Sequence, residues 1–187
     1  REIERGRQAY VVCPLIEANE ESDLPSAEEV YAELSHGSFR GIRCGLVHGR
    51  LKAADKEAVM CGFYAGEIKL LVATTVIEVG VNVPNATVLV VEHAERFGLA
   101  QLHQLRGRVG RGRERAYAYF LYPGDKPLTE TAHQRLRTIA NNTDLGAGMQ
   151  VAMKDLEIRG AGNLLGGEQS GHIAGVGFDL YLRMVGD

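Results

Sequence analysis

The sequence has few cysteines, no tryptophan and no long apolar run, and these absences exclude several classes of protein. Three cysteines are an odd number, which argues against a disulfide framework, and Cys13, Cys44 and Cys61 lack the spacing of zinc ligands. No segment approaches the roughly 20 apolar residues of a membrane span, and the first five residues lack the apolar core of a signal peptide. We therefore expect a cytoplasmic protein with no membrane association and no metal site.

Charge is unevenly distributed along the 187 residues, although the formal net charge is only −3. Residues 17–33 contain seven acids and no base, as expected for a solvated helix face. Residues 96–115 contain six arginines and one acid. A run of arginines in a slightly acidic chain predicts a local anion site rather than a general affinity for polyanions.

Segments typical of strands and helices alternate over the first two thirds of the chain. Short apolar runs predict strands at residues 8–13, 42–47, 70–73, 88–91 and 116–122. Helices are predicted at residues 26–34, 53–64 and 99–106, and Ser26 with Glu29 forms a capping-box pattern at the first. Continuously apolar strands are typical of a parallel sheet that helices cover on both faces. The sequence thus predicts an α/β domain over residues 1–123.

The pattern changes after Pro123, where a second unit is predicted over residues 124–187. Apolar residues recur at helical spacing over 132–140 and 149–156, with a polar turn between them, which predicts a helical hairpin. Residues 160–177 contain seven glycines, which excludes a regular element. A last short helix is predicted at residues 178–184. The second unit should therefore consist of a helical hairpin and a glycine-rich loop.

The strongest chemical signal is the segment Gln104-Leu105-Arg106-Gly107-Arg108-Val109-Gly110-Arg111. Arg108 and Arg111 each follow a glycine, so the backbone can approach a ligand while both guanidinium groups reach one anion. A guanidinium group donates paired hydrogen bonds to phosphate and keeps its charge at any relevant pH. The alternative is a solvated basic turn, but the pattern Q-x-x-G-R-x-G-R at the end of a predicted helix favours a phosphate site.

Three segments resemble, in the same order, motifs of superfamily-two helicases and translocases. Residues 104–111 resemble motif VI, Thr74-Thr75-Val76-Ile77-Glu78-Val79-Gly80-Val81-Asn82-Val83-Pro84 resembles motif V, and Val47-His48-Gly49-Arg50 matches the motif after the second strand. Residues 97–111, 155–162 and 168–171 narrow the resemblance to the family of RecG and Mfd, the transcription-repair coupling factor. The resemblance implies a second RecA-like lobe followed by the translocation (TRG) element of that family.

The resemblance is mixed along the chain. Residues 1–112 are more similar to RecG, whereas the segment from Ala116 onward is more similar to Mfd. A divergent family member and an engineered hybrid would both explain this mixture.

The resemblance also implies a role for individual residues. Arg111 would supply an arginine finger to ATP, and Arg108 would make a second contact to its γ-phosphate. The residues implied to lie near the nucleotide are Gly80, Asn82 and Gln104. The residues implied to contact the DNA backbone are His48, Arg50, Thr74 and Thr75, the two threonines through hydroxyl and backbone N–H groups. The residues implied to couple hydrolysis to DNA movement are Glu78, Arg159 and Gln169.

The chain contains no G-x-x-x-x-G-K-[ST] phosphate loop and no DEAD- or DEAH-type acidic pair after a strand. Hydrolysis of ATP requires the phosphate cradle and Mg²⁺ as much as the arginine. We therefore expect the chain alone to be inactive, with ATP and Mg²⁺ bound mainly by the first RecA-like lobe of a longer repair protein. The expected partners are that lobe, duplex or branched DNA, and RNA polymerase through other domains. The alternative is a non-catalytic nucleic-acid-binding or protein-interaction module that keeps the fold.

Overall fold

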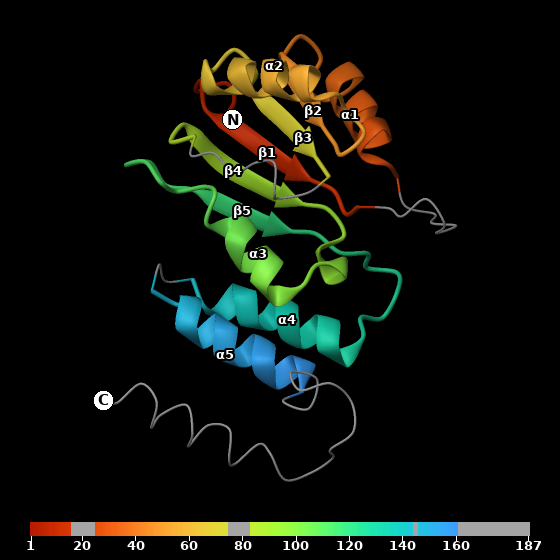
Figure 1. Ribbon diagram of the computed structural model, residues 1–187, viewed down its shortest axis with the longest axis vertical. Helices are drawn as coiled ribbons and strands as arrows, with labels where there is room; N and C mark the ends of the chain where they lie inside the picture. Colours follow the sequence, from red (N-terminus) through yellow and green to blue (C-terminus); the bar gives the residue numbers. More distant parts are fainter. Residues whose placement is uncertain (16–24, 75–82, 144–145, 161–187) are drawn as a thin grey trace.

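The computed structural model describes residues 1–15, 25–74, 83–143 and 146–160. In these residues, one parallel sheet has the strand order β2-β3-β1-β4-β5 (Figure 1). The strands are β1 (Gln8–Val12), β2 (Cys44–Val47), β3 (Leu70–Ala73), β4 (Ala86–Val91) and β5 (Tyr117–Phe120). The helices are α1 (Ala27–His36), α2 (Ala53–Tyr64), η1 (Ala94–Arg96), α3 (Leu99–Arg106), α4 (Glu130–Asn141) and α5 (Gly148–Arg159). The predicted parallel sheet is confirmed, and each strand end lies within two residues of its predicted position.

Helices pack on both faces of the sheet, as the continuously apolar strands predict. Tyr10 and Leu71 point to one face, where Phe63 of α2 and the buried leucines of α3 join the same core. Val11 points to the other face, where it packs with Val30 of α1. The strand residues therefore alternate between two apolar environments, one on each face of the sheet.

The start of α1 shows how a local sequence pattern sets a helix boundary. The Ser26 hydroxyl accepts a hydrogen bond from the Glu29 backbone N–H at 3.2 Å, and the Glu29 carboxylate accepts one from the Ser26 N–H at 2.7 Å. This reciprocal pair satisfies donors that the first turn of a helix leaves free. The predicted capping box is therefore confirmed, and α1 extends to His36 rather than ending at residue 34.

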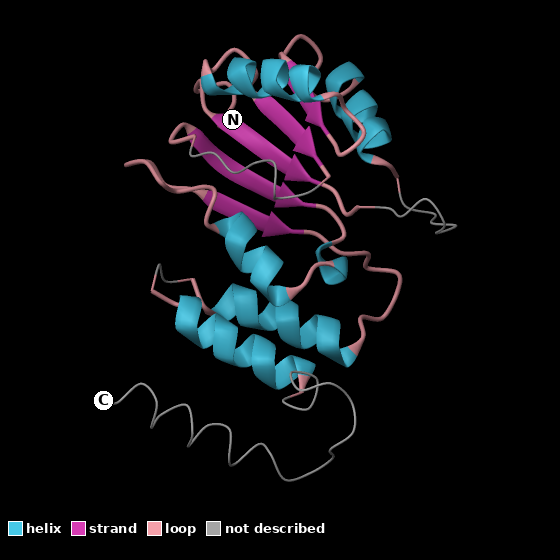
Figure 2. Cartoon of the chain, in the orientation of Figure 1, coloured by secondary structure: helices cyan, strands magenta, loops and turns pink. Residues whose placement is uncertain are grey.

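The predicted helical hairpin is confirmed by α4 and α5, which lie side by side beneath α3 (Figure 2). Ile139 and Val151 from the hairpin belong to the core that underlies the sheet, so the hairpin is anchored to the α/β layer by apolar packing. The division at residue 123 stays a prediction. The glycine-rich segment beyond Gly160 and the predicted helix at 178–184 lie outside the described residues. None of the described helices is both long and apolar enough to cross a membrane.

The two ends of the sheet differ because all of its strands run in one direction. We call the end where the strands begin the amino end and the opposite end the carboxyl end. Helices α2 and α3 run back from the carboxyl end, so both finish at the amino end. The loop after α3 therefore lies at the amino end, whereas residues directly after β2 and β3 lie at the carboxyl end.

Candidate functional site

Residues 107–116, here called the arginine loop, connect α3 to β5 at the amino end of the sheet (Figure 1). Arg111 is exposed, and its Nε donates a hydrogen bond to the Gly107 carbonyl at 2.7 Å. Arg108 is half-buried, and its Nε has no hydrogen-bond partner among the described residues. A buried donor without a partner is costly, so this guanidinium group is suited to donate hydrogen bonds to an anionic ligand.

Two glycines of the arginine loop are required by its geometry. Gly110 has a φ of +78°, a backbone conformation that other residues rarely adopt. At Gly112, a Cβ atom would lie 2.9 Å from the carbonyl oxygen of Pro84, a residue of the segment that leads into β4. The glycines thus permit a tight turn and close contact with a second segment.

Tyr10 of β1 lies within electrostatic reach of the arginine loop. Burial, and to a lesser extent the nearby Tyr64, raise the pKa of the Tyr10 hydroxyl to about 12, against the opposing effect of Arg108 and Arg111. The hydroxyl therefore stays protonated at neutral pH. Its oxygen has no hydrogen-bond partner among the described residues. This part of the amino end thus combines two cations with a neutral buried hydroxyl.

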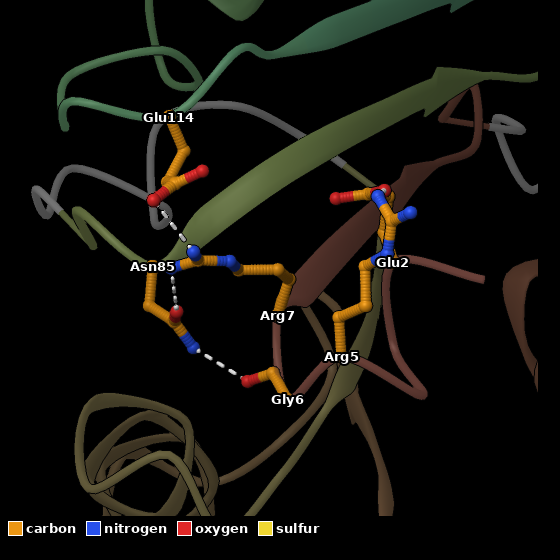
Figure 3. A network of polar contacts seen from close by, with 6 residues as sticks. All are labelled: Glu2, Arg5, Gly6, Arg7, Asn85 and Glu114. Atoms are coloured by element: carbon orange, nitrogen blue, oxygen red, sulfur yellow. Dashed lines mark hydrogen bonds and ion pairs between the residues drawn. The ribbon is translucent and has the colours of Figure 1, made fainter.

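A network of polar side chains holds the amino end of the sheet together (Figure 3). Arg7 forms an ion pair with Glu114 of the arginine loop at 2.8 Å and donates a hydrogen bond to the Asn85 side-chain oxygen at 3.3 Å. The Asn85 amide donates to the Gly6 carbonyl at 2.9 Å and to the Gln8 side-chain oxygen at 3.2 Å. We call these five residues the amino-end network; it joins the segments that precede β1, β4 and β5.

The amino-end network continues into the core through Gln8, which is 1% exposed. Its amide nitrogen donates to the carbonyl of Phe63 at 2.5 Å and to that of Ile68 at 2.8 Å. The first carbonyl lies in the last turn of α2, and the second lies in the connection between α2 and β3. Sequence reasoning missed this network because it treats Arg7, Gln8 and Asn85 as ordinary residues at strand starts.

The arginines of residues 96–115 do not form one anion site, which corrects the interpretation of that run. Arg106 donates hydrogen bonds to the carbonyls of Ile139 and Asn142, at the end of α4, and burial lowers the pKa of its guanidinium group. Arg115 lies over the Tyr117 ring, 5.7 Å from its centre. Carbonyls at a helix end attract arginine, but nothing in the local sequence identifies a partner in another helix. The predicted anion site therefore involves Arg108 and Arg111 rather than the whole run of arginines, and it stays a prediction.

The carboxyl end brings together two of the residues assigned to DNA contact. Thr74 follows β3 and His48 follows the neighbouring β2, and the Thr74 backbone N–H donates to the Val47 carbonyl at 3.2 Å. This bond corrects the role assigned to the Thr74 N–H, which is already used within the sheet. Thr74 is 8% exposed, and its hydroxyl has no partner among the described residues. The hydroxyl is therefore the Thr74 group that remains for a ligand.

His48 and Arg50 differ in exposure. The His48 side chain is 14% exposed and its Nε2 lies 3.5 Å from a carboxylate oxygen of Glu28 in α1. Arg50 is exposed, two residues further along. Of the two, Arg50 is therefore the more accessible to a phosphate.

The remaining assigned residues are divided between α3, α5 and segments that the structure does not describe. Gln104 is exposed on α3. Arg159, at the end of α5, pairs with Asp155 at 3.0 Å, and one of its guanidinium nitrogens lies 3.8 Å from the position that a Cβ on Gly98 would occupy. The hairpin thus contacts α3 near both ends, through Arg159 and through the Arg106 bonds to α4. The assigned residues that lie outside the described residues are Thr75, Glu78, Gly80, Asn82 and Gln169.

A cavity of about 840 Å³ separates the arginine loop from the end of α4; Arg106, Arg111 and Ile139 are among its lining residues. Within the described ranges, no three His, Cys, Asp or Glu side chains are grouped to hold a metal ion. The chemistry of the arginine loop fits the phosphates of a nucleotide, whereas the described residues offer no carboxylate cluster for Mg²⁺.

Comparison with known proteins identifies the class. The model of the helicase conserved C-terminal domain matches residues 1–113, and the chain belongs to that family. The chain is 54% identical, over all 187 residues, to the transcription-repair-coupling factor of Mycobacterium tuberculosis, of which it spans 14%. It is 52% identical over 170 residues to the ATP-dependent DNA helicase RecG of Escherichia coli K12. The matched residues make up 91% of this chain and 24% of that protein. The chain thus spans a quarter or less of the curated relatives named here.

Solved structures support the same assignment. A structure of RecG bound to a three-way DNA junction superposes with a TM-score of 0.71 at 44% sequence identity. The match covers 97% of this chain and 23% of the RecG chain. The C-terminal domain of the DEAD-box protein Dbp5 matches with a TM-score of 0.52 at 16% identity, which is likeness of fold alone. The resemblance to RecG and Mfd and the RecA-like parallel sheet are therefore confirmed.

Proposed function

We propose that this chain is the second RecA-like lobe of an ATP-dependent, double-stranded DNA translocase of DNA repair, acting in fork remodelling or transcription-coupled repair. The observation that carries this proposal is the arginine loop, with an exposed Arg111 and a half-buried Arg108 whose Nε lacks a described partner. The similar proteins, an ATP-dependent DNA helicase and a transcription-repair-coupling factor, support the same function.

The position of the arginine loop supports action on a nucleotide that another domain holds. Open α/β sheets bind their own ligands beyond the carboxyl ends of the strands. The arginine loop instead lies at the amino end, and the sequence contains no phosphate loop. In the proposed motor the first RecA-like lobe binds ATP and Mg²⁺ and this chain completes the site.

In that site Arg111 acts as the arginine finger, stabilising the charge that spreads over the transferred phosphoryl group. Such a group contributes a factor of about 10³–10⁵ to the rate in other nucleotide hydrolases. Arg108 makes a second contact to the γ-phosphate, and Gln104, Gly80 and Asn82 line the nucleotide. Bound Mg²⁺ neutralises phosphate charge, and the carboxylates for it come from the first lobe.

The carboxyl end of β2 and β3 serves as the DNA contact in this proposal. His48, Arg50, Thr74 and Thr75 contact backbone phosphates, which positions a duplex without reading its sequence. The similar RecG structure is bound to a DNA junction. We expect the isolated chain to bind duplex or branched DNA weakly, with an affinity that falls steeply as salt rises.

Helix α3 couples the two activities in this proposal. The arginine loop directly follows α3, and the hairpin contacts the same helix through Arg106 and near Gly98 through Arg159. A shift of α3 on ATP binding would therefore move the hairpin with it. Arg159, with Glu78 and Gln169, transmits this movement to the duplex, and RNA polymerase is contacted by other domains.

The test is Arg111→Ala in the longer protein, with Arg113→Ala as the matched control. Arg113 is an exposed arginine of the same loop, so its removal changes the local charge equally. We expect Arg111→Ala to lower the DNA-stimulated kcat for ATP by about 10³-fold and to leave DNA affinity unchanged. Arg113→Ala should change kcat by less than about threefold, since exposed charges interact weakly in water.

Two results would contradict the proposal. Loss of DNA affinity without loss of ATP hydrolysis in Arg111→Ala would favour the non-catalytic nucleic-acid-binding module. Measurable DNA-stimulated ATP turnover by the pure 187-residue chain would show that the site is not divided between two lobes.

A further inference from the structure

The amino-end network connects the arginine loop to the rest of the lobe through Glu114, three residues after Arg111 (Figure 3). Glu114 pairs with Arg7, Arg7 donates to Asn85, and Asn85 donates to Gln8, whose amide is anchored on two buried carbonyls. The chain of contacts therefore runs without a gap from an exposed loop to a residue that is 1% exposed. It crosses three separate segments of the sequence.

We infer that Arg7 is a positioning residue for the arginine loop: by holding Glu114, it sets where Arg111 stands relative to the phosphates of ATP. The inference rests on the proposed role of Arg111. It adds a residue to the ATP site that lies directly before β1 and outside all three resembled motifs. Arg7 touches no phosphate itself; it acts through Glu114.

The geometry of the loop makes such support necessary. Residues 107–116 form neither helix nor strand, and Gly110 gives the backbone a turn with φ of +78°. Directly after Arg111, Gly112 fits against the Pro84 carbonyl, where a Cβ would be only 2.9 Å away. Two residues further along, the Arg7–Glu114 pair holds the segment that leads into β5. The part of the loop that follows Arg111 is thus held by these two contacts with neighbouring segments.

A positioning role predicts a different result from a purely stabilising role. The Arg7 and Glu114 side chains are 31% and 55% exposed, and ion pairs at such positions add little to the free energy of unfolding. Misplacement of a catalytic group by about 1 Å, in contrast, can lower a rate by as much as about 10²-fold. Loss of the pair should therefore lower kcat without a matching loss of stability.

The experiment measures DNA-stimulated ATP hydrolysis and thermal unfolding for Arg7→Ala, Glu114→Ala and the double variant, all in the longer protein. We expect each single variant to lower kcat about tenfold, with KM for ATP and Tm nearly unchanged. The double variant should lose no more kcat than either single variant, because each single variant already removes the same contact. Arg7→Lys keeps the charge opposite Glu114 and should recover most of the lost kcat.

The matched control is Arg43→Ala. Arg43 forms an ion pair with Glu67 at 2.5 Å, with side-chain exposures of 64% and 55%, and it also lies at the amino end of the sheet. This pair joins the segments before β2 and β3 and is not a member of the amino-end network. We expect its removal to leave kcat within about twofold of the unaltered protein.

The outcomes separate this inference from the proposed function. If Arg111→Ala abolishes hydrolysis while Arg7→Ala and Glu114→Ala leave kcat unchanged, the positioning role is wrong and the arginine finger stands. Additive losses in the double variant, or an equal loss in Arg43→Ala, would also overturn the positioning role. If Arg111→Ala itself retains full ATP hydrolysis, both the proposed function and this inference are wrong.

Discussion

Backbone hydrogen bonds join the strands at both ends of the sheet, and the amino end adds a network of side-chain contacts. At the carboxyl end, His48 and Thr74 stand next to each other because their strands pair in register through backbone hydrogen bonds. At the amino end, Arg7, Asn85 and Glu114 meet through side chains that come from three separate segments. The first arrangement follows from the backbone of a parallel sheet, whereas the second depends on the identity of each side chain.

This difference predicts where substitutions should lower the stability of the fold. A contact made by the backbone ladder survives most changes of side chain, because every residue carries the same N–H and C=O groups. A network of side chains is destabilised when its buried member is removed, because buried groups then lose hydrogen bonds, whereas its exposed members add little to stability. We therefore expect stability to be sensitive to substitution of the buried Gln8 at the amino end and tolerant of substitutions at the carboxyl end.

The largest effect on stability is expected for Gln8→Leu. The leucine fills a similar space but removes the hydrogen bonds to the carbonyls of Phe63 and Ile68, and one of the two bonds that the Asn85 amide donates. We expect the free energy of unfolding to fall by about 3 kcal/mol, measured by urea denaturation of the 187-residue chain. Gln134→Leu is the control, since Gln134 pairs with Glu130 on the exposed side of α4. A loss below about 1 kcal/mol in Gln8→Leu would mean that the network does not hold the amino end.

A smaller effect is expected for Arg106→Met, which keeps an apolar stem but removes the donors to Ile139 and Asn142. We expect the free energy of unfolding to fall by about 1.5–2 kcal/mol, together with faster hydrogen exchange at the end of α4. Arg111→Met should leave both quantities unchanged, because Arg111 donates to the Gly107 carbonyl within its own loop. Equal effects of the two variants would show that the hairpin is held by apolar packing alone.

The smallest effect, and one of opposite sign, is expected at the carboxyl end for Thr74→Val. The Thr74 hydroxyl is buried without a partner among the described residues, so an isosteric methyl group should raise the free energy of unfolding by up to about 0.5 kcal/mol. Thr138→Val is the control, because the Thr138 hydroxyl donates to the Gln134 carbonyl at 2.7 Å and its loss should destabilise the chain. A clear loss of stability in Thr74→Val would contradict the expectation that the carboxyl end tolerates substitution better than the amino end.

Much of the fold could be predicted from local patterns. The apolar runs gave each strand within two residues of its observed ends, and the capping box placed the start of α1 within one residue. The glycine–arginine pattern also marked the loop whose turn requires Gly110. These features were predictable because strand alternation, helix capping and tight turns depend on neighbours in the sequence.

The candidate site was predictable only in part. The sequence marked Arg108 and Arg111, but it also counted Arg106 and Arg115 in the same basic run, and these two contact α4 and Tyr117 instead. It assigned the Thr74 N–H to DNA, although the strand ladder already uses that group. In both cases the deciding partner lies elsewhere in the chain, so inspection of the motif alone could not identify it.

The sequence by itself determined the α/β class, the strands and helices, and a loop in which glycines allow two arginines to approach an anion. Each of these depends on residues within a few positions of one another. Only the tertiary structure decided which arginines stay available and which polar residues form the amino-end network. Arg7 and Asn85 are 78 positions apart and Gln8 and Phe63 are 55 apart, so their contacts exist only after the strands have taken their order in the sheet.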